Sequence, residues 1–260
     1  MQQLAGKVAI ITGGGHGIGR QIALVYAGAG ARLLLTARDT APLQETRAEL
    51  ERAGTECVAI QADVALEADC ARMAERAISA FGRIDILVNN AGIGGPTARL
   101  TETTLADWQE TIDINLTGTF LATRAVLPQM EKQRSGSILN IASVAARRGF
   151  PLRAAYAASK WAMIGLTQTL AMEWAPYGVR VNGICPGAVE GPRIERVFRA
   201  RAAATGRPYE EVKAEVAASA AMKRLVTEDE IARVALFLVS EEASSMTGQT
   251  LNADAGIVMS

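Results

Sequence analysis

The chain opens with a short apolar run, a glycine-rich turn and a helical pattern, and this order restricts what the remainder can fold into. The run spans Val8 to Ile11, and the turn carries the spacing Gly13-x-x-x-Gly17-x-Gly19. In a strand–turn–helix unit, Gly13 permits the tight turn, Gly17 lets the backbone approach a diphosphate, and Gly19 lets helix and strand pack closely. The first turn of the helix then faces the negative charge. The pattern predicts a phosphate cradle, with glycines of an ordinary strand–helix turn as the alternative.

Short apolar runs and helical patterns then alternate along the chain. Further strands are expected at residues 32–37, 56–61, 84–88, 137–141, 180–185 and 251–253. Helices are expected at 42–53, 66–81, from about 103, in a longer stretch that holds Asn115 and reaches 130, and at 153–175 and 227–240. This close alternation predicts an α/β fold, a doubly wound parallel sheet of the Rossmann type with about seven strands and helices on both faces. No repeat, low-complexity tract or linker interrupts it, so one domain over residues 1–260 is expected.

Right-handed crossovers place the carboxyl ends of parallel strands at one edge of the sheet, where ligands bind. Polar or small residues follow several of the expected strands at that edge. They are Asp63, the run Asn89-Asn90-Ala91-Gly92, Ser143, and the pair Pro186-Gly187. The sequence therefore predicts a ligand site at this edge.

A tyrosine and a lysine stand one helical turn apart, as Tyr156-x-x-x-Lys160, in an alanine-rich stretch downstream of Ser143. Residues i and i+4 share a helix face, so the phenol and the ammonium point into the same space. A phenol titrates near pH ~10, and a neighbouring cation favours its ionised form, so the pair can move a proton near neutral pH. An isolated pair of this kind is more often a packed tyrosine beside an unrelated surface lysine.

Composition excludes several classes of function. The 260 residues are 49% hydrophobic with a formal net charge of zero, which gives no reason to expect nucleic acid or an anionic membrane as partner. No apolar run is long enough to span a bilayer, and the N-terminus lacks a secretory pattern. The scattered cysteines Cys57, Cys70 and Cys185 indicate reduced thiols of a cytoplasmic protein. His16 is the single histidine, so no metal site is expected.

The residues at the end of the second strand indicate which dinucleotide such a cradle binds. A dinucleotide site often places an acidic residue there to bind the adenosine ribose hydroxyls, and Ala37 stands at that position, followed by Arg38. An arginine there can pair with a 2′-phosphate, which favours NADP(H) over NAD(H). Asp39 keeps NAD(H) open, because a shift of one residue would restore the acid. An ordinary surface role for Arg38 is also open.

The pattern loosens over residues 188–225, where two helices follow the sixth strand, and such an insertion suits a substrate lid. Arginines surround the expected pocket at Arg147, Arg148, Arg153, Arg193 and Arg196. One or two of them are hypothesised to bind an anionic substrate group, a carboxylate or sulfonate. The alternative is that they are solvated surface charges.

The assembled motifs resemble the short-chain dehydrogenase/reductase family over nearly the whole chain. The resemblance depends on Thr12-Gly13-x-x-x-Gly17-x-Gly19, Asp63, Asn89-Asn90-Ala91-Gly92, Asn115, Ser143, Tyr156-x-x-x-Lys160 and Pro186-Gly187, in the family's order. It implies a catalytic group of Asn115, Ser143, Tyr156 and Lys160. Ser143 and Tyr156 would donate hydrogen bonds to the substrate oxygen, and Tyr156 would exchange a proton with it. Lys160 would lower the pKa of Tyr156 and hold the nicotinamide ribose, while Asn115 would anchor a water linking Lys160 to solvent.

The resemblance also implies a set of residues that bind the nicotinamide cofactor. They are Gly13, Gly15, His16, Gly17, Ile18, Arg38, Asp63, Val64, Asn89, Ala91, Gly92, Tyr156, Lys160, Pro186, Gly187 and Val189. One departure is that Gly191 stands near the position where the family commonly has a threonine that contacts the carboxamide. The family is usually tetrameric, so a homotetramer is implied, and no metal is required.

These observations favour an NAD(P)(H)-dependent oxidoreductase that interconverts a secondary alcohol and a ketone. The alternative is a catalytically silent dinucleotide-binding sensor or scaffold. A sugar-nucleotide epimerase or dehydratase is a third possibility, but the stretch after Pro186 leaves little room for a larger substrate domain.

Overall fold

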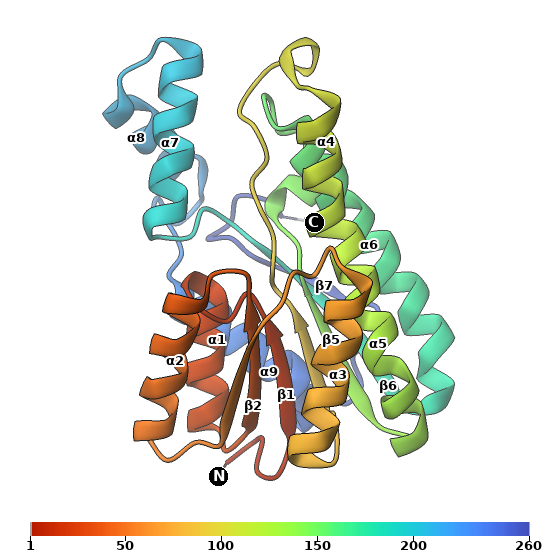
Figure 1. Cartoon of the computed structure of the whole chain (residues 1–260). Coiled ribbons are helices and arrows are strands. Elements are labelled where there is room, and N and C mark those ends of the chain that lie inside the picture. Colours follow the sequence, from red (N-terminus) through yellow and green to blue (C-terminus); the bar gives the residue numbers. More distant parts are fainter. Residues whose placement is uncertain (1, 260) are drawn as a thin grey trace.

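Seven parallel strands form the central sheet of the computed structural model, which describes residues 2–259. Their order across the sheet is β3-β2-β1-β4-β5-β6-β7, so the chain winds outward in both directions from β1 and β4 (Figure 1). The strands are β1 Val8–Thr12, β2 Arg32–Ala37, β3 Cys57–Gln61, β4 Ile86–Asn89, β5 Gly136–Ile141, β6 Val179–Pro186 and β7 Thr250–Ala253. The predicted doubly wound α/β fold is confirmed.

Helices cover both faces of the sheet. One layer holds α1 Gly17–Gly28, α2 Thr40–Arg52 and α9 Glu228–Val239, which pack in one hydrophobic cluster. The other layer holds α3 Glu67–Phe81, α5 Gly118–Gln133 and α6 Ala154–Trp174, with α4 Leu105–Ile112 beside α6 (Figure 1). Within residues 2–259, no helix combines the length and the apolar character that crossing a membrane requires.

Successive residues of a strand pack against the two helix layers in turn, because their side chains point to opposite faces of the sheet. In β1, Ala9 and Ile11 belong to the α1–α9 cluster, whereas Ile10 belongs to the α3–α5 cluster. In β2, Leu33 and Leu35 belong to the first cluster and Leu34 to the second. Strands apolar on both faces are typical of a parallel sheet covered on both sides.

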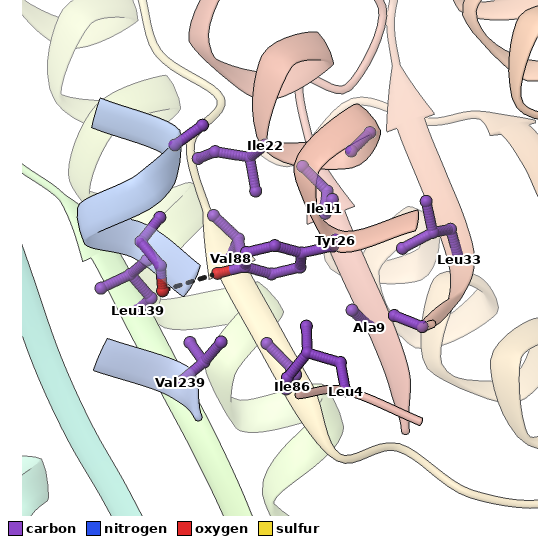
Figure 2. Packing of buried hydrophobic residues seen from close by; sticks show 14 of the residues in the cluster. Leu4, Ala9, Ile11, Ile22, Tyr26, Leu33, Ile86, Val88, Leu139 and Val239 are labelled. Atoms are coloured by element: carbon purple, nitrogen blue, oxygen red, sulfur yellow. Dashed lines mark hydrogen bonds between the residues drawn. The ribbon is translucent and has the colours of Figure 1, made fainter. Parts of the chain in front are cut away.

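The first cluster encloses a polar atom as well as apolar ones. Tyr26 of α1 is fully buried among residues from β1, β2 and β4, and its hydroxyl donates to the carbonyl oxygen of Ala235 in α9 at 3.0 Å (Figure 2). Burial raises the pKa of Tyr26 well above its ordinary value, so the phenol stays protonated and remains a donor. This bond joins the first and the last long helix of the same layer.

Two helix boundaries differ from the sequence-based expectation. The stretch expected to continue as helix to 130 contains a π-helical turn, Asp113–Thr117, between α4 and α5. The helix expected from Pro42 begins at Thr40, because the Asp39 carboxylate accepts from the backbone N–H of Ala41 at 3.2 Å and caps it.

The segment expected as a lid contains α7 Pro192–Thr205 and α8 Tyr209–Ser219. The two helices stand above the carboxyl ends of the strands, on the side of α1 and α2 (Figure 1). They enclose a small cluster of their own, centred on Phe198, Ala202 and Val212.

We expect Gly19→Ala to destabilise the fold and Gly28→Ala, in the same helix, to leave it intact. A Cβ on Gly19 would collide with the carbonyl oxygen of Gly13 and the side-chain amide of Asn90, whereas one on Gly28 meets nothing within 4 Å. The expected cost for Gly19→Ala is about 1–3 kcal/mol or more. Gly28→Ala should gain roughly 0.4–1 kcal/mol. Urea unfolding of both variants tests this, and equal midpoints would contradict the close approach.

Candidate active site

The glycine turn between β1 and α1 forms an open cradle. Gly13 and Gly17 have φ values of 67° and 59°, a region that favours glycine. His16 precedes α1 without capping it through its side chain, and no acidic residue lies in the first turn of the helix. The free N–H groups and the positive helix end are therefore available to an anion. These features fit a dinucleotide diphosphate.

The cradle is joined to the end of β4 by Thr12 and Asn90. The Asn90 side-chain amide donates to the carbonyl oxygens of Thr12 and Gly13, at 2.9 and 3.2 Å. The Thr12 hydroxyl accepts from the backbone N–H groups of Asn90 and Ala91, both at 3.0 Å, and donates to Val88 O at 3.2 Å. Both residues stand in the motifs on which the resemblance depends, but neither was among the predicted site residues.

A cleft of about 450 Å³ runs from the cradle along the ends of β2 and β3. Arg38, Asp63 and Val64 line it, and Arg38 Nη1 lies 3.9 Å from Asp63 Oδ2. Ala37 ends β2, as expected, so no acidic side chain stands at the strand end. Asp39 also lines the cleft, but its carboxylate caps α2.

A second cavity, of about 900 Å³, continues from the cradle toward the lid segment. The two cavities share several lining residues, among them Gly13, His16, Ala91, Gly92, Arg153, Arg193 and Arg196. Most of the predicted site residues line the second one, namely Gly13, His16, Gly17, Ile18, Ala91, Gly92, Ser143, Tyr156, Lys160, Pro186, Gly187 and Val189. The structure thus brings the predicted phenol, ammonium and hydroxyl to one cavity next to the cradle.

Lys160 lines this cavity and is almost fully buried. Its ammonium nitrogen is 5.9 Å from the centroid of the Tyr156 ring, one turn earlier on α6, and donates to Ile141 O at 2.8 Å. The side chain is 4% exposed. Burial lowers the pKa of the Lys160 ammonium to about 7, and the positive charge of Arg193 adds to the lowering. The lysine can therefore change its charge near neutral pH.

Ser143 follows β5 and begins a short 3₁₀ turn, Val144–Ala146. Its hydroxyl accepts from the backbone N–H of Ala145 at 3.2 Å. The hydroxyl proton is left for an acceptor in the cavity.

Asn115 sits in the π-helical turn, and its fully buried side chain holds the loop after β4. Its Oδ1 accepts from Ile93 N at 2.8 Å, and its Nδ2 donates to Ile93 O at 3.0 Å and Ser159 Oγ at 3.1 Å. The side chain supports the cavity wall from behind and does not line the cavity. A π turn inside a helical stretch is a feature frequent at functional sites.

Two further predicted residues also lie behind the cavities. Asn89 is buried and donates to Thr123 Oγ1 and Asn140 Oδ1, both at 2.9 Å. Gly15 faces the start of α2, where a Cβ would come within 3.0 Å of the backbone nitrogen of Leu43. Neither residue belongs to the lining of the two cavities.

The five arginines of the predicted anion site separate into two groups. Arg147 turns away and donates to the carbonyl oxygen of Thr250, the first residue of β7, at 2.6 Å. The other four, Arg148, Arg153, Arg193 and Arg196, line the second cavity.

The chain is similar to known oxidoreductases over almost its whole length. The family model described as enoyl-(acyl carrier protein) reductase matches residues 13–258. A 3-oxoacyl-(acyl-carrier-protein) reductase of Synechocystis sp. is 38% identical over 261 residues, covering 100% of both chains. An uncharacterized oxidoreductase of Thermotoga maritima is 39% identical, over 96% of this chain and 97% of that protein.

Solved structures show the same fold at similar identity. The crystal structure of NAD⁺-bound xylitol dehydrogenase superposes with a TM-score of 0.95 at 34% identity, covering 97% of this chain and 99% of that one. Levodione reductase gives a TM-score of 0.93, also at 34% identity, with 97% of each chain covered.

These likenesses place the protein among the enzymes that oxidise or reduce small molecules with a nicotinamide dinucleotide. The chain belongs to the short-chain dehydrogenase/reductase family, as its motifs predicted. The prediction of an enzyme is confirmed as well.

The buried ammonium predicts an unusual pH dependence of stability. Between pH ~7 and pH ~10.5 the unfolded chain binds the Lys160 proton more tightly than the folded chain, so stability rises with pH there. In Lys160→Met this contribution is absent. Without cofactor, the variant should be more stable than wild type by about 2–4 kcal/mol at pH 6.5 and by much less at pH 9.5.

Urea unfolding of both cofactor-free proteins at the two pH values measures this difference. Titration of Cys57 and Cys70 is common to both proteins and cancels in the comparison. A stability difference that is the same at both pH values would contradict the buried, weakly basic lysine.

Proposed function

We propose that the protein interconverts a secondary alcohol and a ketone, with Tyr156 as the general acid and base. The observation that carries this proposal is that Ser143, Tyr156 and Lys160 line one cavity that opens onto the glycine cradle. The identity of the reacting group follows from the chemistry of this set. A hydroxyl donor, a phenol and a cation together serve an oxygen that gains and loses negative charge.

The bound nicotinamide supplies or accepts the hydride. In reduction, Ser143 Oγ donates a hydrogen bond to the substrate oxygen, and Tyr156 Oη gives its proton to it. In oxidation, Tyr156 Oη takes that proton back. The Lys160 ammonium, beside the ring, stabilises negative charge on the phenol oxygen when its proton has left. Asn115 acts on this group indirectly, through the loop that it holds behind Lys160.

The proposed cofactor contacts follow the cleft lining. The cradle residues Gly13, His16, Gly17 and Ile18 hold the diphosphate, and Asp63 and Val64 meet the adenine. Tyr156 and Lys160 hold the nicotinamide ribose, and Pro186, Gly187 and Val189 hold the nicotinamide end. Gly15 and Asn89 would contribute by packing only.

The proposal extends to the organisation of the protein. One domain over residues 1–260 would bind the dinucleotide and carry the catalytic residues, with 188–225 as the substrate lid. A homotetramer is supported by large apolar side chains exposed on α5 and α6, namely Phe120, Trp161 and Met172. The cytoplasmic location draws support from Cys57, Cys70 and Cys185, which are free thiols.

NADP(H) is the proposed cofactor. Arg38 lines the adenosine end of the cleft and is half-exposed, so its guanidinium is available to a 2′-phosphate. Ala37 leaves space at the strand end, and Asp39 is engaged as a helix cap. One structural relative was solved with NAD⁺ bound, so the preference of this protein for NADP(H) over NAD(H) is to be measured directly.

Tyr156→Phe should abolish most of the turnover and spare cofactor binding. Removing the hydroxyl removes the proton donor, for which we expect a fall in kcat of about 10²- to 10⁴-fold. Affinity for the cofactor should change only severalfold. The matched control is Tyr177→Phe, outside both cavities, which should keep wild-type kcat. A Tyr156→Phe enzyme with wild-type kcat would overturn the proposed role.

Cofactor preference should follow residues 37 and 38. Wild type is expected to bind NADPH more tightly than NADH, and Arg38→Leu should weaken NADPH by roughly tenfold or more while changing NADH little. Ala37→Asp should reverse the preference, because the new carboxylate accepts from ribose hydroxyls and repels a phosphate. Fluorescence titration of both cofactors measures this. An unchanged NADPH/NADH ratio in Arg38→Leu would refute the assignment.

A further inference from the structure

Arg153 is a buried cation directly beside the proposed proton donor. It precedes α6, three residues before Tyr156, and its side chain places the guanidinium carbon 5.1 Å from the centroid of the Tyr156 ring. Only 6% of the residue is exposed, yet it lines both cavities of the cleft. Arginines are rarely buried to this extent without a paired charge.

The backbone leaves room for this side chain. Arg153 donates through Nε and Nη2 to the carbonyl oxygen of Gly94, at 3.1 and 2.7 Å. A Cβ on Gly94 would collide with Nη2, so glycine at this position is what lets the guanidinium lie against the loop. Within residues 2–259, Nη1 makes no hydrogen bond, so this nitrogen is free to donate to a ligand in the cavities that Arg153 lines.

No carboxylate offsets this charge. Among the described residues, neither Arg153 nor Arg193 forms an ion pair, although Arg193 lies nearby and donates to Gly92 O at 3.2 Å. Burial lowers the pKa of Arg153, and Arg193 lowers it further, against an opposing effect of Tyr156. Arg153, Lys160 and the exposed Arg193 therefore bring positive charge to one cavity. The two buried groups, Arg153 and Lys160, are costly there until an anion enters.

Four acidic residues line the second cavity, and among the described residues none of them forms an ion pair with Arg153. Glu190 is exposed to solvent. Glu215 pairs with Arg201 and Arg207, and Asp39 caps α2. Glu228 lies against the cradle, where its Oε1 is within 3.6 Å of the position of a Cβ on Gly17. The positive charge at Arg153 is thus open toward the substrate end of the cavity.

We propose that the substrate carries an oxyanion, a carboxylate or sulfonate, a few bonds from its carbonyl, and that Arg153 binds this group beside Tyr156. The inference rests on the proposed alcohol–ketone activity and names its substrate class. A short oxo acid or hydroxy acid fits, because the guanidinium stacks on the ring whose hydroxyl meets the reacting oxygen. The planar fork of arginine matches a carboxylate, and a charged hydrogen bond here is formed with little competing water.

The test compares acids with their neutral esters. Acetoacetate and 4-oxopentanoate are reduced by the cofactor-loaded enzyme beside their methyl esters, and kcat/KM is measured for each. Wild type should favour the acid of each pair by about tenfold or more. Arg153→Gln should lower that ratio at least tenfold, and Arg153→Lys, which keeps the charge, should retain part of it.

The acid/ester ratio separates charge recognition from structural damage. Loss of the bond to Gly94 would slow both members of a pair and leave their ratio unchanged. Arg199→Gln is the matched control, because it removes one charge from α7 at a position outside both cavities and should keep the wild-type ratio. A direct readout is the thermal shift of the enzyme–cofactor complex with unreactive 4-hydroxybenzoate against its methyl ester, where only the acid should stabilise wild type.

The outcomes distinguish this inference from the proposed function. Equal use of acids and esters by wild type overturns the anionic substrate but leaves ketone reduction standing. An Arg153→Gln enzyme with a raised KM for the cofactor and an unchanged acid/ester ratio shows that the guanidinium serves the cofactor, which also overturns it. Turnover of no ketone in either form would remove the proposed activity itself.

Discussion

The rest of the site depends on the hydrogen bonds between the end of β1, where the glycine turn begins, and the end of β4. Thr12 and Asn90 exchange hydrogen bonds across two neighbouring strands, and Gly19 brings α1 against them. A parallel sheet places these strand ends together but leaves their loops undetermined. Because the side chains of Thr12 and Asn90 tie the loops to one another, the phosphate cradle has a set position relative to the wall of the cavity.

That wall is then held by side chains from the π-helical turn, from the start of α6 and from α7. Asn115 grips both polar groups of Ile93, Arg153 grips Gly94, and Arg193 reaches Gly92 from the lid segment. Each contact engages the backbone, so the loop keeps its course while its small residues leave the cavity open. The catalytic set and the cofactor cradle are therefore coupled through one short loop.

The sequence predicted the fold because alternating apolar runs have a direct cause in a covered parallel sheet, and motif residues at strand ends meet at one edge. It missed the π turn, since a change from i+4 to i+5 bonding leaves no periodic signal around Asn115. It also could not rank the arginines. Arg147 and Arg153 are the same residue type at nearby positions. Only the packed structure shows that Arg147 bonds to Thr250 in β7, while Arg153 bonds to Gly94 and lines the cavity.

The buried charges of the cavity link ligand binding to the stability of the folded protein. Lys160 and Arg153 are desolvated without carboxylate partners, so they make the empty fold less stable than an apolar replacement would. A ligand that brings negative charge offsets this cost only when bound, and its binding therefore adds stability to the folded state. The same desolvation strengthens each interaction with the reacting oxygen, because little water competes for it. The same buried charges thus lower the stability of the unliganded protein and strengthen substrate selectivity and catalysis in the complex.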